Sequence, residues 1–262
     1  MEYDRLDRRN REKYLDRVLF GRMGCTRCGL LGQGAFSDVY CVEDAFGGRQ
    51  YACKVSSHVA MLEKEAVVMA KLHHPLFPEY ISFQETAGLG ILFREYVPGS
   101  CLKELLGRRR FSAEQTVRAG MELAEGLQYL HGRPERFLFR DIKPANIIVR
   151  QDGKIRLIDF GCVCSMEESF TSRAGSPGYA APEQLQDGGI LTESCDVYGL
   201  GQTLKEMLGR NFRCLPGRIR RKGWLKRMRL GRILDACTEE EPARRPADMG
   251  QVWCELMRLY ME

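Results

Sequence analysis

The sequence has no apolar run approaching the roughly 20 residues that a membrane-spanning helix requires. It also has no low-complexity tract and no internal repeat, and its first residues, Met1-Glu2-Tyr3-Asp4-Arg5, lack the apolar core of a secretion signal. These absences predict a cytoplasmic protein without a transmembrane span. With 44% hydrophobic and 29% charged residues, the 262-residue chain can bury the core of one large domain or of two small lobes.

Eleven cysteines are scattered through the chain. Without a secretion signal they are expected to be free thiols, because disulfides are rare in reducing compartments. Cys25-Thr26-Arg27-Cys28 has the spacing of half a zinc or redox site, but no second Cys/His pair follows at the distance that zinc sites use. Zinc therefore stays the minor alternative at this place.

Acidic residues are absent from 210–232, which contain ten lysines and arginines. This basic patch could meet an acidic protein, an anionic membrane or nucleic acid, or it could be a solvated face with no dedicated partner. Nucleic acid is not expected as the partner. The sequence does not indicate the oligomeric state.

Periodicity and turn residues predict a strand-rich first part and a helical remainder. Residues 1–20 are expected to form a short amphipathic helix or a frayed extension. Ser112 and Gln115 have the spacing of a capping box. Strands around glycine-rich turns are expected within 30–40 and at 50–55, 79–84, 90–96, 146–149 and 154–158. Helices are expected at 58–72, 101–107, 112–131, 194–209, 224–237 and 246–259.

Residues 139–161 hold the densest group of side chains suited to chemistry. The first motif is Phe139-Arg140-Asp141-Ile142-Lys143-Pro144-Ala145-Asn146, which contains the candidates Asp141, Lys143 and Asn146. The second motif is Asp159-Phe160-Gly161, in which Asp159 is the candidate. Transfer of a phosphoryl group needs an acceptor for the hydroxyl proton, cations for the phosphates and oxygen ligands for Mg²⁺. This stretch supplies all three, so it predicts phosphoryl-transfer chemistry.

A glycine-rich segment, Gly32-Gln33-Gly34-Ala35-Phe36-Ser37-Asp38-Val39, lies between two predicted strands. It is not a dinucleotide fingerprint, because a strand rather than a helix follows, and glycine alone could serve only the geometry of a hairpin. Lys54 on the next strand has apolar neighbours and therefore needs an anion. Glu65 is the first candidate for that anion, and Glu63 is the competing one.

These motifs, with Ala181-Pro182-Glu183 downstream, resemble the eukaryotic-type (Hanks-type) protein kinase family, in its serine/threonine branch and its compact bacterial members. The resemblance covers residues 28–255. It implies an α+β, bilobal fold with a cleft between the lobes, ATP and Mg²⁺ as cofactors, and a protein substrate. The implied organisation is a charged N-terminal extension at 1–27, a small β-rich N-lobe at 28–97 and a larger helical C-lobe at 98–262.

The resemblance implies a role for each residue of the motifs. Asp141 would accept or orient the substrate hydroxyl proton, and Lys143 would neutralise charge on the transferred group. Lys54, paired with Glu65, would hold the α- and β-phosphates. The resemblance implies Mg²⁺ ligands at Asn146 and Asp159, and nucleotide contacts at Gly32, Gln33, Gly34, Val39, Ala52, Glu95, Val97 and Ile148.

Two residues depart from the family pattern. Arg94 stands where the family usually has an apolar or small gatekeeper, which affects inhibitor fit more than catalysis. Phe139 stands where the family often has histidine, and it would stack beneath Phe160 as a packing residue. Lys143 and Ser176 match the serine/threonine branch.

Other residues would build the frame of the site. The resemblance implies a buried ion pair between Glu183 and Arg245, and contacts from Asp196 to the backbone of the catalytic loop. The segment from Asp159 to Glu183 would be the activation segment, and Arg140 could receive a phosphate placed there. Its candidate phosphorylation sites are Ser169, Thr171 and Ser172.

We therefore predict a non-specific, ATP-dependent serine/threonine protein kinase that autophosphorylates in its activation segment. One alternative is a pseudokinase that binds ATP and acts by interaction, and another is a small-molecule kinase of related fold. Family members that act on basic substrates carry acidic residues at two positions that are Cys101 and Ala145 here. A neutral or acidic protein substrate is therefore expected, and the basic patch at 210–232 is its expected docking place.

Overall fold

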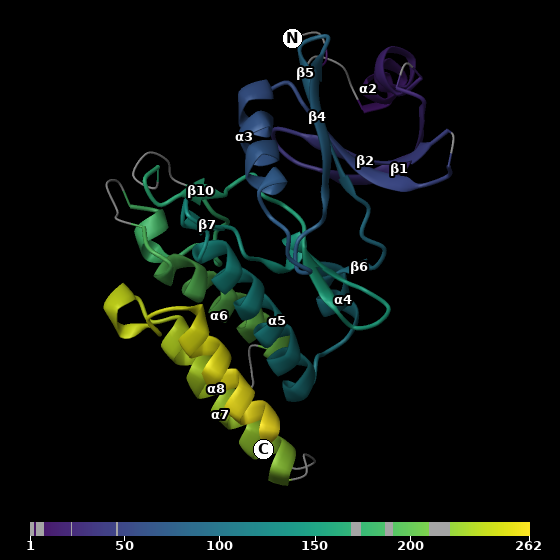
Figure 1. Cartoon of the computed structure of the whole chain (residues 1–262). Coiled ribbons are helices and arrows are strands. Elements are labelled where there is room, and N and C mark those ends of the chain that lie inside the picture. The colour runs from purple at the N-terminus through teal and green to yellow at the C-terminus, as the bar shows by residue number, and fades with distance from the viewer. Residues whose placement is uncertain are drawn as a thin grey trace. The chain divides into compact units, whose positions relative to one another are not determined.

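The computed structural model describes residues 3, 8–21, 23–45, 47–168, 174–186, 191–209 and 221–262 (Figure 1). The chain divides into two compact units, one formed by residues 1–73 and 78–97 and the other by residues 74–77 and 98–262. The first unit is rich in strands and the second is mostly helical. The α+β class expected from the sequence is thereby confirmed.

A five-stranded antiparallel sheet of order β1-β2-β3-β5-β4 forms the first unit. One helix, α3 (Val59–Ala70), packs against β4 and β5 (Figure 1). The chain reverses between β1 and β2 where the amide of Gly34 donates to the carbonyl of Ser37 at 2.8 Å. The strands are β1 (Cys25–Gln33), β2 (Asp38–Asp44), β3 (Gln50–Ser56), β4 (Tyr80–Thr86) and β5 (Leu89–Glu95).

The register of the sheet decides which side chains share a face. Lys54 pairs with Val39 on β2, and Ala52 pairs with Arg94 on β5. Because successive side chains along a strand point to opposite faces, these four residues lie on the same face of the sheet. This is the face that carries Lys54, the predicted phosphate-binding lysine.

The N-terminal segment contributes to the core on the opposite face. It contains α2 (Arg8–Leu15) and a π-helix, η1 (Asp16–Phe20). Tyr3, Leu15 and Phe20 are buried in one apolar cluster with Tyr40 and Val42 of β2. The rings of Phe20 and Tyr40 meet edge to face at 6.1 Å. Residues before position 28, expected to be a charged extension, therefore supply part of the first unit's core.

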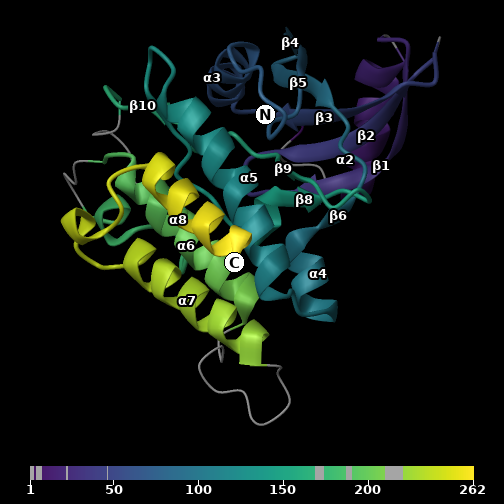
Figure 2. The same ribbon diagram turned by 60° about the horizontal axis from the view of Figure 1, so that its bottom comes forward.

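The helices of the second unit are α4 (Leu102–Arg108), α5 (Ala113–His131), α6 (Ser194–Leu208), α7 (Arg221–Cys237) and α8 (Met249–Met261). Figure 2 shows α5, α6, α7 and α8 side by side. The predicted capping box at the start of α5 is confirmed, because Ser112 and Gln115 exchange side-chain to backbone hydrogen bonds of 3.0 and 3.1 Å. Helix α8 begins three residues later than expected, where Asp248 accepts a hydrogen bond from the Gln251 amide at 2.8 Å.

Short strands carry the motif-bearing loops of this unit. A three-stranded sheet has the order β6-β8-β9, and β7 pairs with β10. The strands are β6 (Ser100–Cys101), β7 (Phe137–Leu138), β8 (Ile147–Val149), β9 (Ile155–Leu157) and β10 (Cys164–Ser165).

The second unit also includes His74–Phe77, which precede the last two strands of the first unit in sequence. The carbonyl of Leu76 accepts a hydrogen bond from the Leu157 amide at 2.9 Å. Gly126 of α5 makes room for the Leu76 side chain, because a Cβ at position 126 would lie 2.3 Å from it. Among the described residues, no helix has both the length and the apolar character that crossing a membrane demands.

Candidate functional site

Lys54 and Glu65 form a buried ion pair in the first unit. The Lys54 Nζ lies 2.7 Å from Glu65 Oε2, and the two residues are only 8% and 4% exposed. Leu62, Glu65, Ala66 and Met69 form the buried stripe of α3, whereas Glu63 is exposed. The structure therefore selects Glu65 rather than Glu63 as the partner of the buried lysine.

The glycine-rich loop, defined here as residues 32–39, is attached to the rest of the first unit at its tip. Ser56 Oγ, at the end of β3, donates to the Phe36 carbonyl at 2.6 Å. The Phe36 ring meets the His58 ring edge to face at 5.2 Å, although Phe36 itself is 60% exposed. Ser56 and His58 were not predicted, because both contacts depend on the tertiary turn after β3.

Arg94 is 4% exposed on the face of the sheet that also carries Ala52 and Lys54. A buried guanidinium presents five N–H donors and no acceptor. The candidate gatekeeper position therefore carries a buried cation in the first unit.

Asp141 is the centre of a polar cluster in the second unit. Its Oδ2 accepts hydrogen bonds from Lys143 Nζ at 2.8 Å and from Asn146 Nδ2 at 3.0 Å. Lys143 Nζ also donates to Ser176 Oγ at 2.6 Å. The structure thus brings together four residues that the sequence separates by up to 35 positions.

The two carboxylate oxygens of Asp141 differ in their surroundings. Oδ2 has two donors, but Oδ1 is buried and has no hydrogen-bond partner among the described residues. Leaving a buried charged oxygen without a donor is costly in a structure that serves only its own stability. Oδ1 is therefore the Asp141 oxygen that is left to accept a further hydrogen bond.

Asn146 and Asp159 are brought close through the backbone. The amide of Ile158, the residue before Asp159, donates to the Asn146 carbonyl at 2.9 Å. Because the Asn146 amide nitrogen donates to Asp141, the side-chain oxygen of Asn146 points to other partners. An amide oxygen and a carboxylate are ligands that Mg²⁺ accepts when nucleotide phosphates supply the rest.

No group of three or more His, Cys, Asp or Glu side chains suited to a metal ion occurs within the described ranges. A cation that is bound largely by phosphate oxygens needs only one or two protein ligands, so the pair fits such a cation. Cys25 and Cys28 are both free thiols.

Phe139 is fully buried, and its ring meets the Phe160 ring edge to face at 5.5 Å. Phe77 contacts Phe160 from another side at 5.4 Å. The predicted stacking of Phe139 on Phe160 is present. Among the described residues no polar partner faces the Phe139 side chain, so the position does not need a histidine.

Asp196 contacts the backbone of the predicted catalytic loop, as expected. Its Oδ2 accepts from the Phe139 amide at 2.7 Å, and its Oδ1 accepts from the Arg140 amide at 2.7 Å. His131 Nε2 lies 2.8 Å from Asp196 Oδ2 in the same buried network. His131 was not predicted, because a lone histidine at the end of a helix gives no signal in the sequence.

Arg140 is buried with a φ of 69°, a conformation that is uncommon outside glycine and that often marks a functional site. Its Nη1 donates to Cys164 Sγ at 3.0 Å. The pKa of Cys162 is raised to about 11, first by burial and then by the carboxylates of Asp141 and Asp159. That thiol is therefore neutral at physiological pH and poorly reactive.

The candidate phosphorylation sites Ser169, Thr171 and Ser172 lie outside the described residues. The same is true of residues 210–220 of the basic patch. The phosphate-receiving role of Arg140 and the phosphorylation of this segment stay predictions.

The predicted ion pair between Glu183 and Arg245 is present and bidentate. The Arg245 guanidinium donates to the two Glu183 oxygens at 2.6 and 2.9 Å and also to the carbonyls of Ser194, Glu239 and Glu240. Its side chain is fully buried, and that of Glu183 is 12% exposed. The pair joins the end of the predicted activation segment to the turn before α8.

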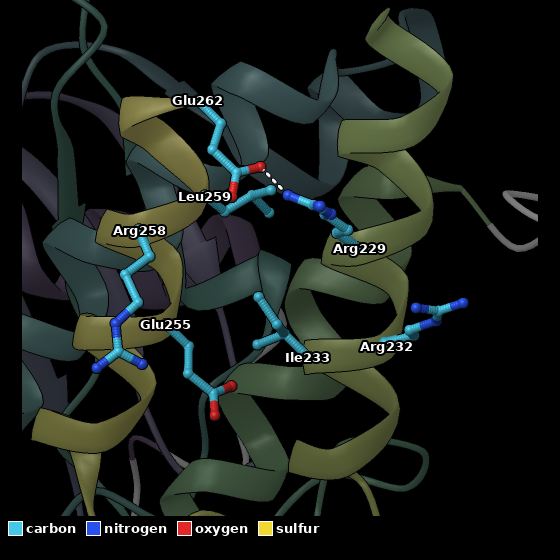
Figure 3. A pocket seen from close by; sticks show the side chains of 7 residues that line it. All are labelled: Arg229, Arg232, Ile233, Glu255, Arg258, Leu259 and Glu262. Atoms are coloured by element: carbon cyan, nitrogen blue, oxygen red, sulfur yellow. Dashed lines mark hydrogen bonds and ion pairs between the residues drawn. The ribbon is translucent and has the colours of Figure 1, made fainter. Parts of the chain in front are cut away.

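A groove of about 250 Å³ lies between α7 and α8, where the described part of the basic patch continues (Figure 3). Arg232 and Arg258 border it from opposite helices, Ile233 and Leu259 supply its apolar side chains, and Glu255 of α8 also lines it. Arg229 also lines the groove but forms an ion pair with Glu262.

The fold and these two groups of side chains are those of the protein kinase class. Residues 26–258 match the protein kinase domain, so the chain belongs to that family.

Several serine/threonine kinases are similar to this chain. It is 29% identical to the cAMP-dependent protein kinase catalytic subunit of Dictyostelium discoideum, over 68% of this chain and 28% of that protein. It is 32% identical to RAC-beta serine/threonine-protein kinase A of Xenopus laevis, over 68% of this chain and 39% of that protein. It is 31% identical to a probable serine/threonine-protein kinase of Streptomyces coelicolor, over 68% of this chain and 29% of that protein. The chain thus spans well under half the length of these relatives.

Proposed function

We propose that this protein is an ATP-dependent serine/threonine protein kinase that transfers the γ-phosphoryl group of ATP to Ser and Thr hydroxyls of proteins. The observation that carries the proposal is the asymmetric Asp141 carboxylate. Lys143 and Asn146 hold one of its oxygens, and the other is buried without a partner among the described residues. That second oxygen is an acceptor for the hydroxyl of a substrate.

In this mechanism Asp141 orients the hydroxyl so that its oxygen attacks the γ-phosphorus as the bond to the β-phosphate oxygen breaks. The hydroxyl proton passes to Asp141 Oδ1, and ADP leaves. Because the transition state of phosphoryl transfer is loose, orientation contributes more than basicity. Lys143, which already bridges Asp141 and Ser176, neutralises charge on the transferred group.

Kinase family membership implies ATP and a divalent cation. We assign the cation, as Mg²⁺, to Asn146 and Asp159, where it would neutralise phosphate charge. We assign the α- and β-phosphates to Lys54, which forms the buried ion pair with Glu65. We assign the other nucleotide contacts to Gly32, Gln33, Gly34, Val39, Ala52, Glu95, Val97 and Ile148.

The two rival functions are a pseudokinase and a small-molecule kinase. A pseudokinase would not need an Asp141 oxygen left without a hydrogen-bond donor, and a small-molecule kinase would not need a surface that binds a peptide. The buried Glu183–Arg245 pair, which fixes the end of the activation segment, favours a protein substrate. The contact between Lys143 and Ser176 favours the serine/threonine branch.

We also propose that a neutral or acidic protein substrate docks near 210–232. The groove between α7 and α8 supports this docking surface, because Arg232 and Arg258 border apolar side chains there, while Glu255 and the paired Glu262 also line it (Figure 3). An apolar side chain of the docking segment would pack on Ile233 and Leu259, and acidic side chains beside it would reach Arg232 and Arg258.

The test is incubation of the purified protein with Mg²⁺ and labelled ATP. We expect autophosphorylation in the segment between Asp159 and Glu183, and label on a protein substrate. Asp141→Asn should abolish both while ATP binding persists, and Asp152→Asn, in an exposed turn, is the matched control. ATP binding without any labelling by the unaltered protein would favour the pseudokinase, and label found only on small molecules would favour the other rival.

A further inference from the structure

Asp38 lies at the base of the glycine-rich loop. It is the first residue of β2 and pairs with Gln33, the last residue of β1, so these two residues close the loop. Its side chain is 3% exposed. Since Val39 is on the face with Lys54, the Asp38 side chain lies on the opposite face of the sheet. A buried carboxylate in this position requires donors.

The N-terminal segment supplies donors to one of the two carboxylate oxygens, Oδ2, whereas Oδ1 has no hydrogen-bond partner among the described residues. The Tyr3 hydroxyl donates to Asp38 Oδ2 at 2.9 Å, and Arg11 Nη1 lies 3.4 Å from the same oxygen. Burial, followed by the neighbouring Tyr40 and Asp38, raises the pKa of Tyr3, so its hydroxyl stays protonated and continues to donate. The guanidinium of Arg11 also lies over the Tyr3 ring, 5.1 Å from its centroid.

The space beside these contacts is not filled by apolar side chains. A cavity of about 300 Å³ lies between Tyr3, Arg11 and residues 34–38 of the loop. A loop that borders a cavity gains little from close packing, so directional hydrogen bonds determine its position. In the described structure the side-chain hydrogen bonds are those of Asp38 at the base and Ser56 at the tip.

We propose that Tyr3 and Arg11 are positioning residues for the nucleotide, because they hold Asp38 and thereby the glycine-rich loop from the back of the sheet. The proposal rests on the proposed function, which assigns this loop to the phosphates of ATP. Loosening the base of the loop should weaken nucleotide binding, whereas phosphoryl transfer from bound ATP should be little affected.

Tyr3→Phe tests the proposal, because it deletes only the hydroxyl. Tyr14→Phe is the matched control: Tyr14 is on the same segment with its ring 6.2 Å from that of Tyr3, and its hydroxyl has no hydrogen bond to a described residue. Loss of a hydrogen bond to a charged group should weaken Mg²⁺-ATP binding about 3- to 10-fold by calorimetry. The kcat at saturating ATP should stay within about twofold, because the residue does not touch the reacting groups.

Arg11→Gln should act in the same direction, with exposed Arg9→Gln as its control. Hydrogen exchange provides a readout that does not depend on activity. In Tyr3→Phe, exchange should rise in residues 33–38 and stay unchanged in β5 at 89–95.

An exchange rate that rises equally across the sheet would show that Tyr3 serves only the stability of the first unit, and it would overturn the proposal. An unchanged loop together with an unchanged Kd would also overturn it. Failure of the proposed function gives a different result: the unaltered protein would bind no ATP, and the exchange measurement would still test the link between Tyr3 and the loop.

Discussion

The buried pair of Glu183 and Arg245 gives a prediction whose size follows from the structure. Glu183→Gln keeps the shape of the side chain and removes its charge. It leaves a fully buried guanidinium with three carbonyl acceptors but no anion. Removing one partner of a buried ion pair lowers the free energy of unfolding by about 3–5 kcal/mol. The amide that replaces the Glu183 carboxylate would keep one oxygen that can accept from Arg245, so we expect a loss of about 3 kcal/mol for this variant.

This loss should be visible in the unfolding of the second unit. For a unit of this size, about 1 kcal/mol lowers Tm by roughly 2–4 °C, so we expect a fall of about 6–12 °C. Both tryptophans of the chain, Trp224 and Trp253, belong to the second unit. Their fluorescence during thermal or urea unfolding therefore reports on the unit that contains the altered pair.

Arg244→Gln is the matched control for this measurement. Arg244 is adjacent in sequence and pairs with Glu241 at 2.7 Å, but the two side chains are 70% and 59% exposed. Exposed pairs contribute less than about 1 kcal/mol. If Glu183→Gln lowers stability no more than Arg244→Gln does, the argument from burial is refuted.

Two further predictions concern activity. Phe139→His should keep kcat within a few-fold, with a stability cost of about 1–3 kcal/mol for burying a polar ring; a loss as large as that of Asp141→Asn would contradict its assignment as a packing residue. Reversing the charges of Arg232 and Arg258 together should raise KM for an acidic peptide substrate about 3- to 10-fold. A peptide array dominated by arginine three residues before the acceptor would contradict this docking surface.

The sequence predicts best where a local period coincides with a spatial contact. Glu65 lies on the stripe Leu62, Glu65, Ala66 and Met69, which repeats at helical spacing, and this stripe is the buried face of α3. The family resemblance pointed to Glu65, and its place on this buried face explains why it, and not Glu63, pairs with Lys54. The capping box at Ser112 was predictable from local spacing, since its donors and acceptors are three residues apart.

Contacts between distant segments have no such local signal, and those that were predicted, such as Glu183–Arg245, were implied only by the family resemblance. The Tyr3–Asp38 hydrogen bond joins residues 35 apart, and the dense charge of residues 1–20 conceals the few apolar side chains that reach the core. The role of His131 likewise depends on Asp196, which is 65 residues away. Asp141, Lys143 and Asn146 were predictable as a group, but the different surroundings of the two Asp141 oxygens are a property of the folded loop.

The position of His74–Phe77 has a consequence for how the chain folds. The second unit is discontinuous, because these four residues are separated from 98–262 by the last two strands of the first unit. They provide the acceptor for the Leu157 amide and an aromatic contact for Phe160. During synthesis residues 74–77 leave the ribosome before residues 98–262, which form the rest of the second unit. Residues 98–262 alone therefore cannot reach the final packing of that unit. The folding of the two units is therefore coupled through the order of the chain itself.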